Sequence, residues 1–169
     1  MIRKLGMSLL VLVGLFGLGE LGARIIWSVP DLSLSPENIH LIDHPTRLWV
    51  QSPNGSFTLP EHGSLTTNAL GLRDDPVAIP KPVNEYRILS LGESSTWGHG
   101  VKRTETYSAQ LEVMLNATGQ SVNVINAGVP AYTIQQSAVY LSEEGSRLQP
   151  NVVLVYHQTN DFLPSGLLY

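Results

Sequence analysis

Three short apolar runs and two stretches of helical periodicity alternate along the second half of the chain. The apolar runs cover residues 88–91, 122–125 and 152–156. Between them, apolar side chains recur at helical spacing, first at Tyr107, Leu111, Met114 and Leu115 and then at Ile134, Ala138, Leu141 and Leu148. The pattern predicts a β-α-β-α-β order with roughly thirty residues per repeat, which is the size of a βαβ crossover.

Crossovers of this kind make the connected strands parallel, and nearly continuous apolar strands are typical of a sheet that helices cover on both faces. We therefore expect residues 86–169 to form a three-layer α/β/α fold of the flavodoxin-like type. Sheets of this type usually contain about five or six strands, and an unpaired apolar edge strand is an aggregation hazard. We interpret residues 86–169 as the N-terminal part of a larger domain.

Residues 28–85 have a different pattern, with many prolines and few periodic apolar runs. This composition argues against long helices. Short strands are predicted at residues 48–50 and 56–59, on either side of a Pro-Asn-Gly turn. We interpret the segment as a spacer that packs in part on the α/β unit. Asn68 and Arg73 are expected at the surface, and the alternative is that they reach the cleft.

The first residues of the chain have the pattern of a membrane segment. Residues 5–27 are mostly apolar and are long enough to cross a hydrocarbon core of about 30 Å. Arg3 and Lys4 precede them, which places the N-terminus in the cytoplasm and the rest of the chain on the extracytoplasmic side. Trp27 suits the membrane interface. The pattern predicts a single-pass signal anchor over residues 1–27.

Two other interpretations of this segment stay open. Its uncharged part is short, which is also typical of a signal peptide that is removed after export. A buried amphipathic helix is the other interpretation, although the run is apolar on all sides and begins almost at residue 1. The chain contains no cysteine and therefore no disulfide, which is compatible with an exported protein.

Charge and residue spacing exclude several classes of site. The net charge is -4 and the pI is about 5.7, so the chain lacks the basic footprint of a nucleic-acid-binding protein. His40, His44 and His62 are not spaced like zinc ligands. Residues 92–100 lack the glycine spacing of nucleotide-binding loops. We expect no nucleic acid, no metal and no cofactor.

Polar turns follow each of the three predicted strands. The first contains Ser94 after Gly92 and Glu93, the second ends in Gly128, and the third contains Asn160. The carboxyl ends of strands in an open parallel sheet meet at one edge, where ligands bind. The following helix N-terminus would favour negative charge near Ser94. A serine hydroxyl, a glycine N–H and an asparagine amide at one edge are the parts of a serine nucleophile with an oxyanion hole.

The three turns, in this order, resemble the sequence blocks of the SGNH (GDSL-type) hydrolase family. Gly92-Glu93-Ser94 is similar to the Gly-Asp-Ser block, the segment ending in Gly128 to the second block, and residues 158–161 to the Gly-x-Asn-Asp block. The resemblance covers about residues 64–164. It implies that Ser94 is the nucleophile. It also implies an oxyanion hole formed by the N–H groups of Ser94 and Gly128 and the side-chain amide of Asn160.

The resemblance further implies a class of chemistry. Family members act on acyl esters through an acyl-enzyme, as esterases, lipases, thioesterases or carbohydrate O-acetyl enzymes, and they need no cofactor. The expected substrate is a carboxylic ester, with acylated carbohydrate and lipid both open. Transfer of the acyl group to a sugar hydroxyl is an alternative to hydrolysis. A membrane-anchored binding or accessory module that keeps the fold without the chemistry is another.

The sequence departs from the family pattern at three points. Glu93 replaces the aspartate of the first block, and Gln158 replaces the glycine of the third. No Asp-x-x-His block, which supplies the catalytic histidine and its acidic partner in the family, follows Asp161.

The missing block leaves the catalytic base open. His99 and His157 are candidates, and Asp161 or Glu105 would have to orient them. We instead interpret the chain as a fragment, with the catalytic histidine and aspartate beyond residue 169. We expect the 169-residue chain alone to have no significant esterase activity.

Overall fold

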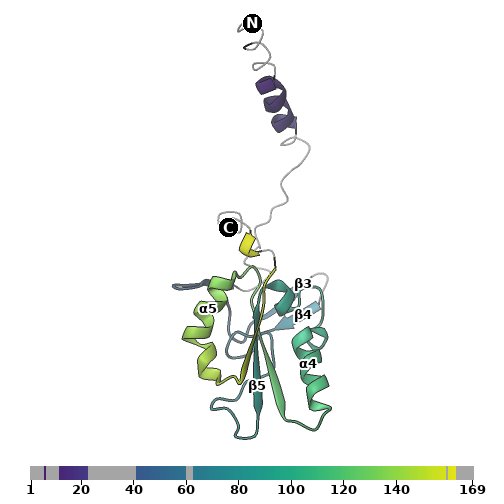
Figure 1. Cartoon of the computed structure of the whole chain (residues 1–169), viewed down its shortest axis with the longest axis vertical. Helices are drawn as coiled ribbons and strands as arrows, with labels where there is room; N and C mark the ends of the chain where they lie inside the picture. Colours follow the sequence, from purple (N-terminus) through teal and green to yellow (C-terminus); the bar gives the residue numbers. More distant parts are fainter. Residues whose placement is uncertain (1–5, 7–11, 23–40, 60–62, 159, 163–169) are drawn as a thin grey trace. The chain divides into compact units, whose positions relative to one another are not determined.

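The computed structural model describes residues 6, 12–22, 41–59, 63–158 and 160–162. The chain divides into two compact units, Met1–Ser33 and Leu34–Tyr169. In the first unit, residues 12–22 are helical (Figure 1), and large apolar side chains such as Phe16 are exposed. The described part of the chain contains no helix with the length and apolar character that a membrane crossing requires. Residues 5, 7–11 and 23–27 of the predicted span 5–27 lie outside the described residues.

The second unit is built on a three-stranded parallel sheet (Figure 1). In the spatial order β6-β5-β7, its strands are β6 (Val122–Gly128), β5 (Tyr86–Gly92) and β7 (Val152–Tyr156). The parallel pairing confirms the predicted strands, and both β5 and β6 extend beyond their predicted ends. At the carboxyl edge, Gly92 lies opposite both Gly128 and Tyr156. The three polar turns therefore begin at the same edge of the sheet.

Two helices of ten residues each lie in the connections between the strands and confirm the mixed α/β fold. They are α4 (Tyr107–Asn116) and α5 (Ile134–Glu143). Each begins after a threonine N-cap, because the hydroxyls of Thr106 and Thr133 accept N–H groups from the first turn. The second helix is shorter than predicted, since α5 ends at Glu143 and a separate 3₁₀ turn, η2 (Gly145–Leu148), follows it. Gly145 is a poor helix former.

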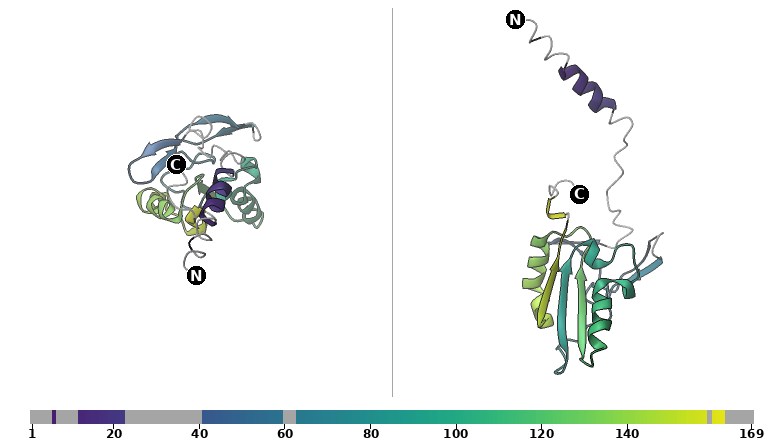
Figure 2. Two further views of the ribbon diagram at one scale, coloured as in Figure 1. Left: turned by 90° about the horizontal axis from the view of Figure 1, so that it is seen from above. Right: turned by 45° about the vertical axis from the view of Figure 1, so that its right-hand side comes forward.

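The two helices cover opposite faces of the sheet. Successive side chains of a strand point to opposite faces, and those of β5 and β6 divide accordingly. Leu89 packs in the cluster that includes Tyr140 of α5, and Ile88 packs in the cluster that includes Leu111 of α4. The right-hand view of Figure 2 shows the three strands side by side between α5 and α4.

The segment before the sheet forms two antiparallel hairpins. β1 (Leu41–His44) pairs with β2 (Leu48–Gln51), and β3 (Ser56–Leu59) pairs with β4 (Gly63–Thr66). β2 and β3 confirm the strands predicted at residues 48–50 and 56–59. The turn between these two strands joins two hairpins and does not close one, because each strand pairs with a different neighbour.

The expectation that Asn68 and Arg73 lie at the surface is wrong. Their exposed fractions are 8% and 1%. The Asn68 carbonyl oxygen Oδ1 accepts the N–H groups of Leu70 and Leu72 at 2.9 and 3.1 Å, so this side chain organises its own turn. Arg73 instead extends to the segment after β5. Both side chains are used inside the fold, and no property of the local sequence requires that.

The two outer edges of the sheet differ. On β6, alternate N–H groups donate to side-chain oxygens: Val122 to Asn116 at 2.8 Å, Val124 to Glu112 at 2.7 Å and Asn126 to Asp74 at 2.7 Å. Such caps leave no row of free donors on which another strand could pair. On β7 no residue is fully buried, and Val155 is 54% exposed. Burial on both faces therefore holds for β5 and β6 but not for β7.

Asp74 makes the β6 edge sensitive to pH. Burial is the largest influence on this carboxyl group and raises its pKa from 3.8 to about 6. Because the folded-state pKa lies above the unfolded value, the stabilisation from protonated Asp74 is complete below pH 3.8. It is lost as the pH rises through about 6.

We predict that the Asp74→Asn variant gains stability relative to the wild-type protein as the pH is raised from about 4 to about 7. The pKa shift limits the change to about 3 kcal/mol. Urea unfolding of both proteins at the two pH values measures it. A stability difference that does not vary with pH would contradict the prediction.

Candidate active site

The Ser94 turn follows β5 directly and has room only for glycine at its start. A Cβ atom at Gly92 would lie 2.0 Å from Thr96 Oγ1 and 2.3 Å from the Tyr156 carbonyl oxygen, so a side chain cannot fit there. α3 (Ser94–Trp97) begins two residues later. Ser94 is partly exposed, and its hydroxyl makes no hydrogen bond with any described residue. The hydroxyl is therefore available to a ligand at the carboxyl edge of the sheet.

Glu93 does not brace this turn in the manner of an N-cap. It precedes α3, but its side chain accepts no hydrogen bond from the helix N–H groups. Its buried carboxylate accepts only a long bond, 3.4 Å, from the Ser95 hydroxyl, and Oε2 has no partner among the described residues. Since α3 is a single turn, any electrostatic help for Ser94 comes from individual N–H groups and not from a long helix dipole.

Gly128, the predicted second donor of the oxyanion hole, lies beneath α3. A Cβ atom there would lie 2.3 Å from the Trp97 nitrogen and 2.7 Å from the Thr96 carbonyl carbon. The Gly128 N–H donates to the Asn126 side-chain oxygen at 3.0 Å. The role of Gly128 in an oxyanion hole stays a prediction, and it requires Asn126 to release this N–H.

The loop after β6 offers an N–H group that the sequence interpretation did not include. Ala131 has a left-handed backbone with φ of 62°, which is unusual for a residue with a side chain. Its N–H has no hydrogen-bond partner among the described residues. Sequence reasoning missed it because an alanine carries no signal for this conformation. The preceding Pro130 is a local sign of a turn.

Asn160 lies beside this loop. It begins the 3₁₀ turn η3 (Asn160–Phe162), and its side-chain amide donates to the Tyr132 carbonyl at 3.1 Å. The next residue, Asp161, accepts the N–H of Ile134 at 2.8 Å, at the start of α5. Two consecutive residues thus attach the turn after β7 to the β6–α5 connection. Ser94 and Asn160 therefore follow neighbouring strands, β5 and β7, at the carboxyl edge.

The two candidate histidines face other groups. His157 Nε2 is 3.0 Å from the Ser137 hydroxyl, and Nδ1 is 3.7 Å from Asp161 Oδ2. Asp161, one of the two carboxylates considered in the sequence, thus lies close to this ring. The serine in contact, however, is Ser137, which is only 2% exposed. His99 lies after α3, and its ring is 6.3 Å from the Trp97 ring.

Glu105, the other carboxylate considered for orienting a histidine, has a structural contact. It closes the 3₁₀ turn η1 (Arg103–Glu105) by accepting the N–H of Lys102 at 2.9 Å. In the described residues no group of three His, Asp or Glu side chains could hold a metal ion.

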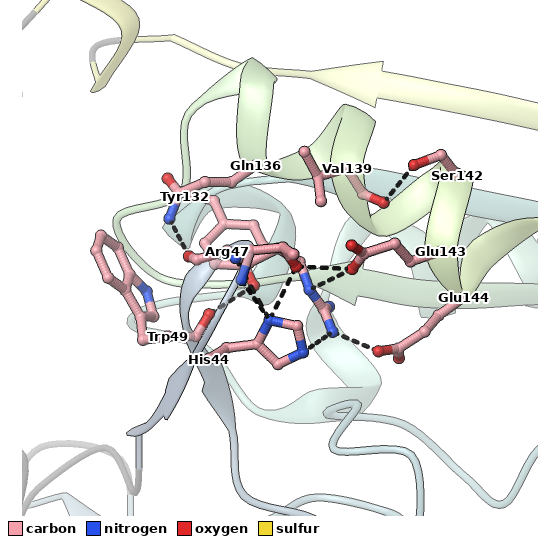
Figure 3. A network of polar contacts seen from close by, with 10 residues as sticks. His44, Arg47, Trp49, Tyr132, Gln136, Val139, Ser142, Glu143 and Glu144 are labelled. Carbon is pink, nitrogen blue, oxygen red and sulfur yellow. Dashed lines mark hydrogen bonds and ion pairs between the residues drawn. The ribbon is translucent and has the colours of Figure 1, made fainter.

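A polar network fastens the β6–α5 loop to the β1–β2 hairpin (Figure 3). The Trp49 indole donates to the Pro130 carbonyl at 3.2 Å, and the Tyr132 hydroxyl donates to the Trp49 carbonyl at 2.7 Å. Burial raises the pKa of Tyr132 to about 12, so this donor keeps its proton at neutral pH. Arg47 forms an ion pair with Glu144 of the segment after α5. The loop that contains Ala131 is therefore held from outside the sheet.

Hollows of about 150 and 130 Å³ lie near α5, and Ser94, Ala131 and Asn160 line neither. Both are smaller than the roughly 300 Å³ of a typical small-molecule site. The carboxyl edge of the sheet is the candidate site because of its chemistry and not because of a deep pocket.

We predict that Gly128→Ala destabilises the protein by about 1–3 kcal/mol, because the added methyl group meets the backbone of α3 and cannot be accommodated by a side-chain movement. The control is Ala131→Gly, which removes one methyl group from the same connection. Glycine adopts the left-handed backbone of residue 131 without steric strain, so this variant is expected to change stability by less than about 1 kcal/mol. Urea unfolding measures both variants. Equal losses in the two would contradict the proposed close contact.

A scan of family models finds no match to this chain. A search of curated proteins finds none either.

Proposed function

We propose that the chain is part of an SGNH-type serine hydrolase that cleaves carboxylic esters with Ser94 as the nucleophile. One observation carries the proposal. A partly exposed serine hydroxyl, with no hydrogen bond to the described residues, follows the central strand of a parallel sheet ordered β6-β5-β7. The strand order reverses at this strand, and ligands bind at such a reversal, beyond the carboxyl ends of the strands.

The proposed reaction begins with attack of the Ser94 oxygen on the ester carbonyl. The new C–O bond forms as the serine proton passes to a base, and the tetrahedral oxyanion is stabilised by N–H donors. The donors we propose are the Ser94 N–H, the Asn160 side-chain amide and the Gly128 N–H, with the Ala131 N–H of the β6–α5 connection as the alternative to Gly128. Collapse expels the alcohol, which takes the proton, and water then hydrolyses the acyl-enzyme. We expect the base in an Asp-x-x-His block, as in the resembled family.

The substrate class follows from the same chemistry. An acyl-enzyme can pass its acyl group to water or to a sugar hydroxyl, so esterase and carbohydrate O-acyltransferase activities share the site. The rival proposal is a binding module that keeps the fold without the reaction. It is favoured by one observation: His157, which has a carboxylate nearby, faces Ser137 instead of Ser94.

We further propose that residues 5–27 anchor the protein in a membrane, with the α/β unit on the extracytoplasmic side. Two observations support this. Arg3 and Lys4 precede the apolar stretch. The helical residues 12–22 expose Leu15, Phe16 and other large apolar side chains, which suit a lipid environment better than water.

We predict that the full-length gene product hydrolyses a short p-nitrophenyl ester and that Ser94→Ala reduces kcat by about 1000-fold or more, since nothing replaces the nucleophile. Asn160→Ala removes one oxyanion donor and is expected to reduce kcat by about 100- to 1000-fold. The release of p-nitrophenol measures both effects.

Ser95→Ala is the matched control, because Ser95 carries the adjacent, exposed hydroxyl and, among the described residues, hydrogen-bonds through it only to Glu93. It is expected to keep wild-type activity. Hydrolysis that survives in Ser94→Ala, or a folded wild-type protein that neither turns over esters nor reacts with a fluorophosphonate, would refute the hydrolase proposal and leave the binding module.

For the anchor, we predict that the protein stays in the membrane fraction after carbonate extraction, whereas a variant lacking residues 1–27 is released. The mass of the mature protein distinguishes the alternatives, because a removed signal peptide would shorten the chain. Full release of the intact chain by carbonate would contradict the anchor.

A further inference from the structure

The guanidinium of Arg73 lies behind the turn that bears Ser94. Its Nη1 donates to the carbonyls of Trp97 and Gly98 at 2.9 and 2.6 Å, and its Nη2 donates to the carbonyl of Val101 at 2.6 Å. Trp97 is the last residue of α3. Carbonyls at a helix C-terminus have no partner within the helix, so Arg73 satisfies the end of α3 and the segment that follows it.

An aromatic contact completes this attachment. The Arg73 guanidinium carbon lies 4.5 Å from the centre of the Trp97 ring. The ring itself is fixed, because its Nε1 donates to Gln51 Oε1 at 2.5 Å and it stacks on Phe57 with ring centres 6.3 Å apart. Gln51 and Phe57 belong to β2 and β3. The two hairpins therefore support the ring on which the arginine rests.

The charge of Arg73 has no carboxylate in contact with it among the described residues. Burying a cation without an ion pair is costly, and an apolar residue would fill the space without that cost. The arginine supplies what an apolar residue cannot, which is several donors in a rigid planar fork. Three backbone carbonyls accept these donors, and the Trp97 ring packs against the guanidinium.

The held carbonyls connect directly to Ser94. The N–H groups of Gly98 and His99 both donate to the Ser94 carbonyl at 2.9 Å. Two peptide units, Trp97–Gly98 and Gly98–His99, thus each accept a hydrogen bond from Arg73 at the carbonyl oxygen and donate one to Ser94 through the N–H. A displacement of residues 97–101 is transmitted to Ser94 through these bonds.

We propose that Arg73 is a positioning residue for Ser94. Its guanidinium holds α3 in place and so fixes the position of the Ser94 nucleophile. This rests on the proposed hydrolase function, and it gives the segment before the sheet a specific role in the site. Glu93 provides no side-chain cap at the start of α3. Arg73 therefore attaches the turn at its C-terminal end, in addition to the contact that Asn126 of β6 makes with the Thr96 carbonyl.

The test compares Arg73→Lys in the full-length gene product with the wild-type protein. Lysine keeps the charge but carries its donors on a single nitrogen, whereas Arg73 contacts the three carbonyls through two nitrogens of a planar fork. Since a misplacement of about 1 Å can cost about 100-fold in rate, we expect kcat and the rate of Ser94 labelling by a fluorophosphonate to fall by about 100-fold, with KM changed little.

Arg87→Lys is the matched control. Arg87 is also fully buried, and it also donates to backbone carbonyls, those of Leu148 at 2.7 Å and Ala78 at 3.1 Å. It lies at the opposite end of β5 from Ser94. We expect Arg87→Lys to lose stability but to keep the wild-type kcat at a temperature where it is folded.

Hydrogen exchange of the α3 segment separates this proposal from the hydrolase proposal. The N–H groups of residues 97–99 are expected to exchange at least about tenfold faster in Arg73→Lys and unchanged in Arg87→Lys. A wild-type protein without activity would refute the hydrolase proposal, while hydrogen exchange would still test the attachment of α3 by Arg73.

Should Arg73→Lys not fold, Trp97→Phe, which removes the hydrogen bond to Gln51, is expected to change exchange and kcat in the same direction. Unchanged exchange and kcat in Arg73→Lys, or an equal fall of kcat in Arg87→Lys, would overturn the proposal.

Discussion

A single turn of helix is not stable by itself in water, because nucleation fixes more backbone than one turn of hydrogen bonds repays. α3 is such a turn, and the position of Ser94 depends on what holds it. On one side, the Asn126 side chain donates to the Thr96 carbonyl at 2.8 Å, and the absent side chain of Gly128 lets β6 come close. On the other side, Arg73 donates hydrogen bonds to the carbonyls at the end of the turn. The sheet and the preceding segment thus fix α3 together.

The segment before the sheet is consequently more than a connection. The β1–β2 hairpin holds the loop after β6 through Trp49 and Tyr132, and β3 supports Trp97 through Phe57. The loop after β6 and the segment after β5 that contains Trp97 both flank the carboxyl edge of the sheet. The elements that carry the proposed chemistry are short, and contacts with the two hairpins fix their positions. This is the usual division between a rigid scaffold and the loops it positions.

Local patterns predicted the central part of the fold because periodicity is a local property. The strands at 122–125 and 152–156 and the helix beginning at Tyr107 each lie where their spacing placed them. Arg73 could not be placed in this way, because its partners are backbone carbonyls 24 to 28 residues later, and backbone atoms have no sequence signature. The N–H of Gly128 was assigned from its place after a strand, but whether it is free depends on the orientation of Asn126.

The central claim is that the carboxyl edge presents Ser94 as a nucleophile. Its most direct test is to treat the full-length gene product with a fluorophosphonate, digest it and locate the adduct by mass spectrometry. The account predicts a single adduct on the peptide that contains Ser94, with none on the buried Ser137, although that serine contacts His157. An adduct on Ser137, or a folded protein without any adduct, would contradict it.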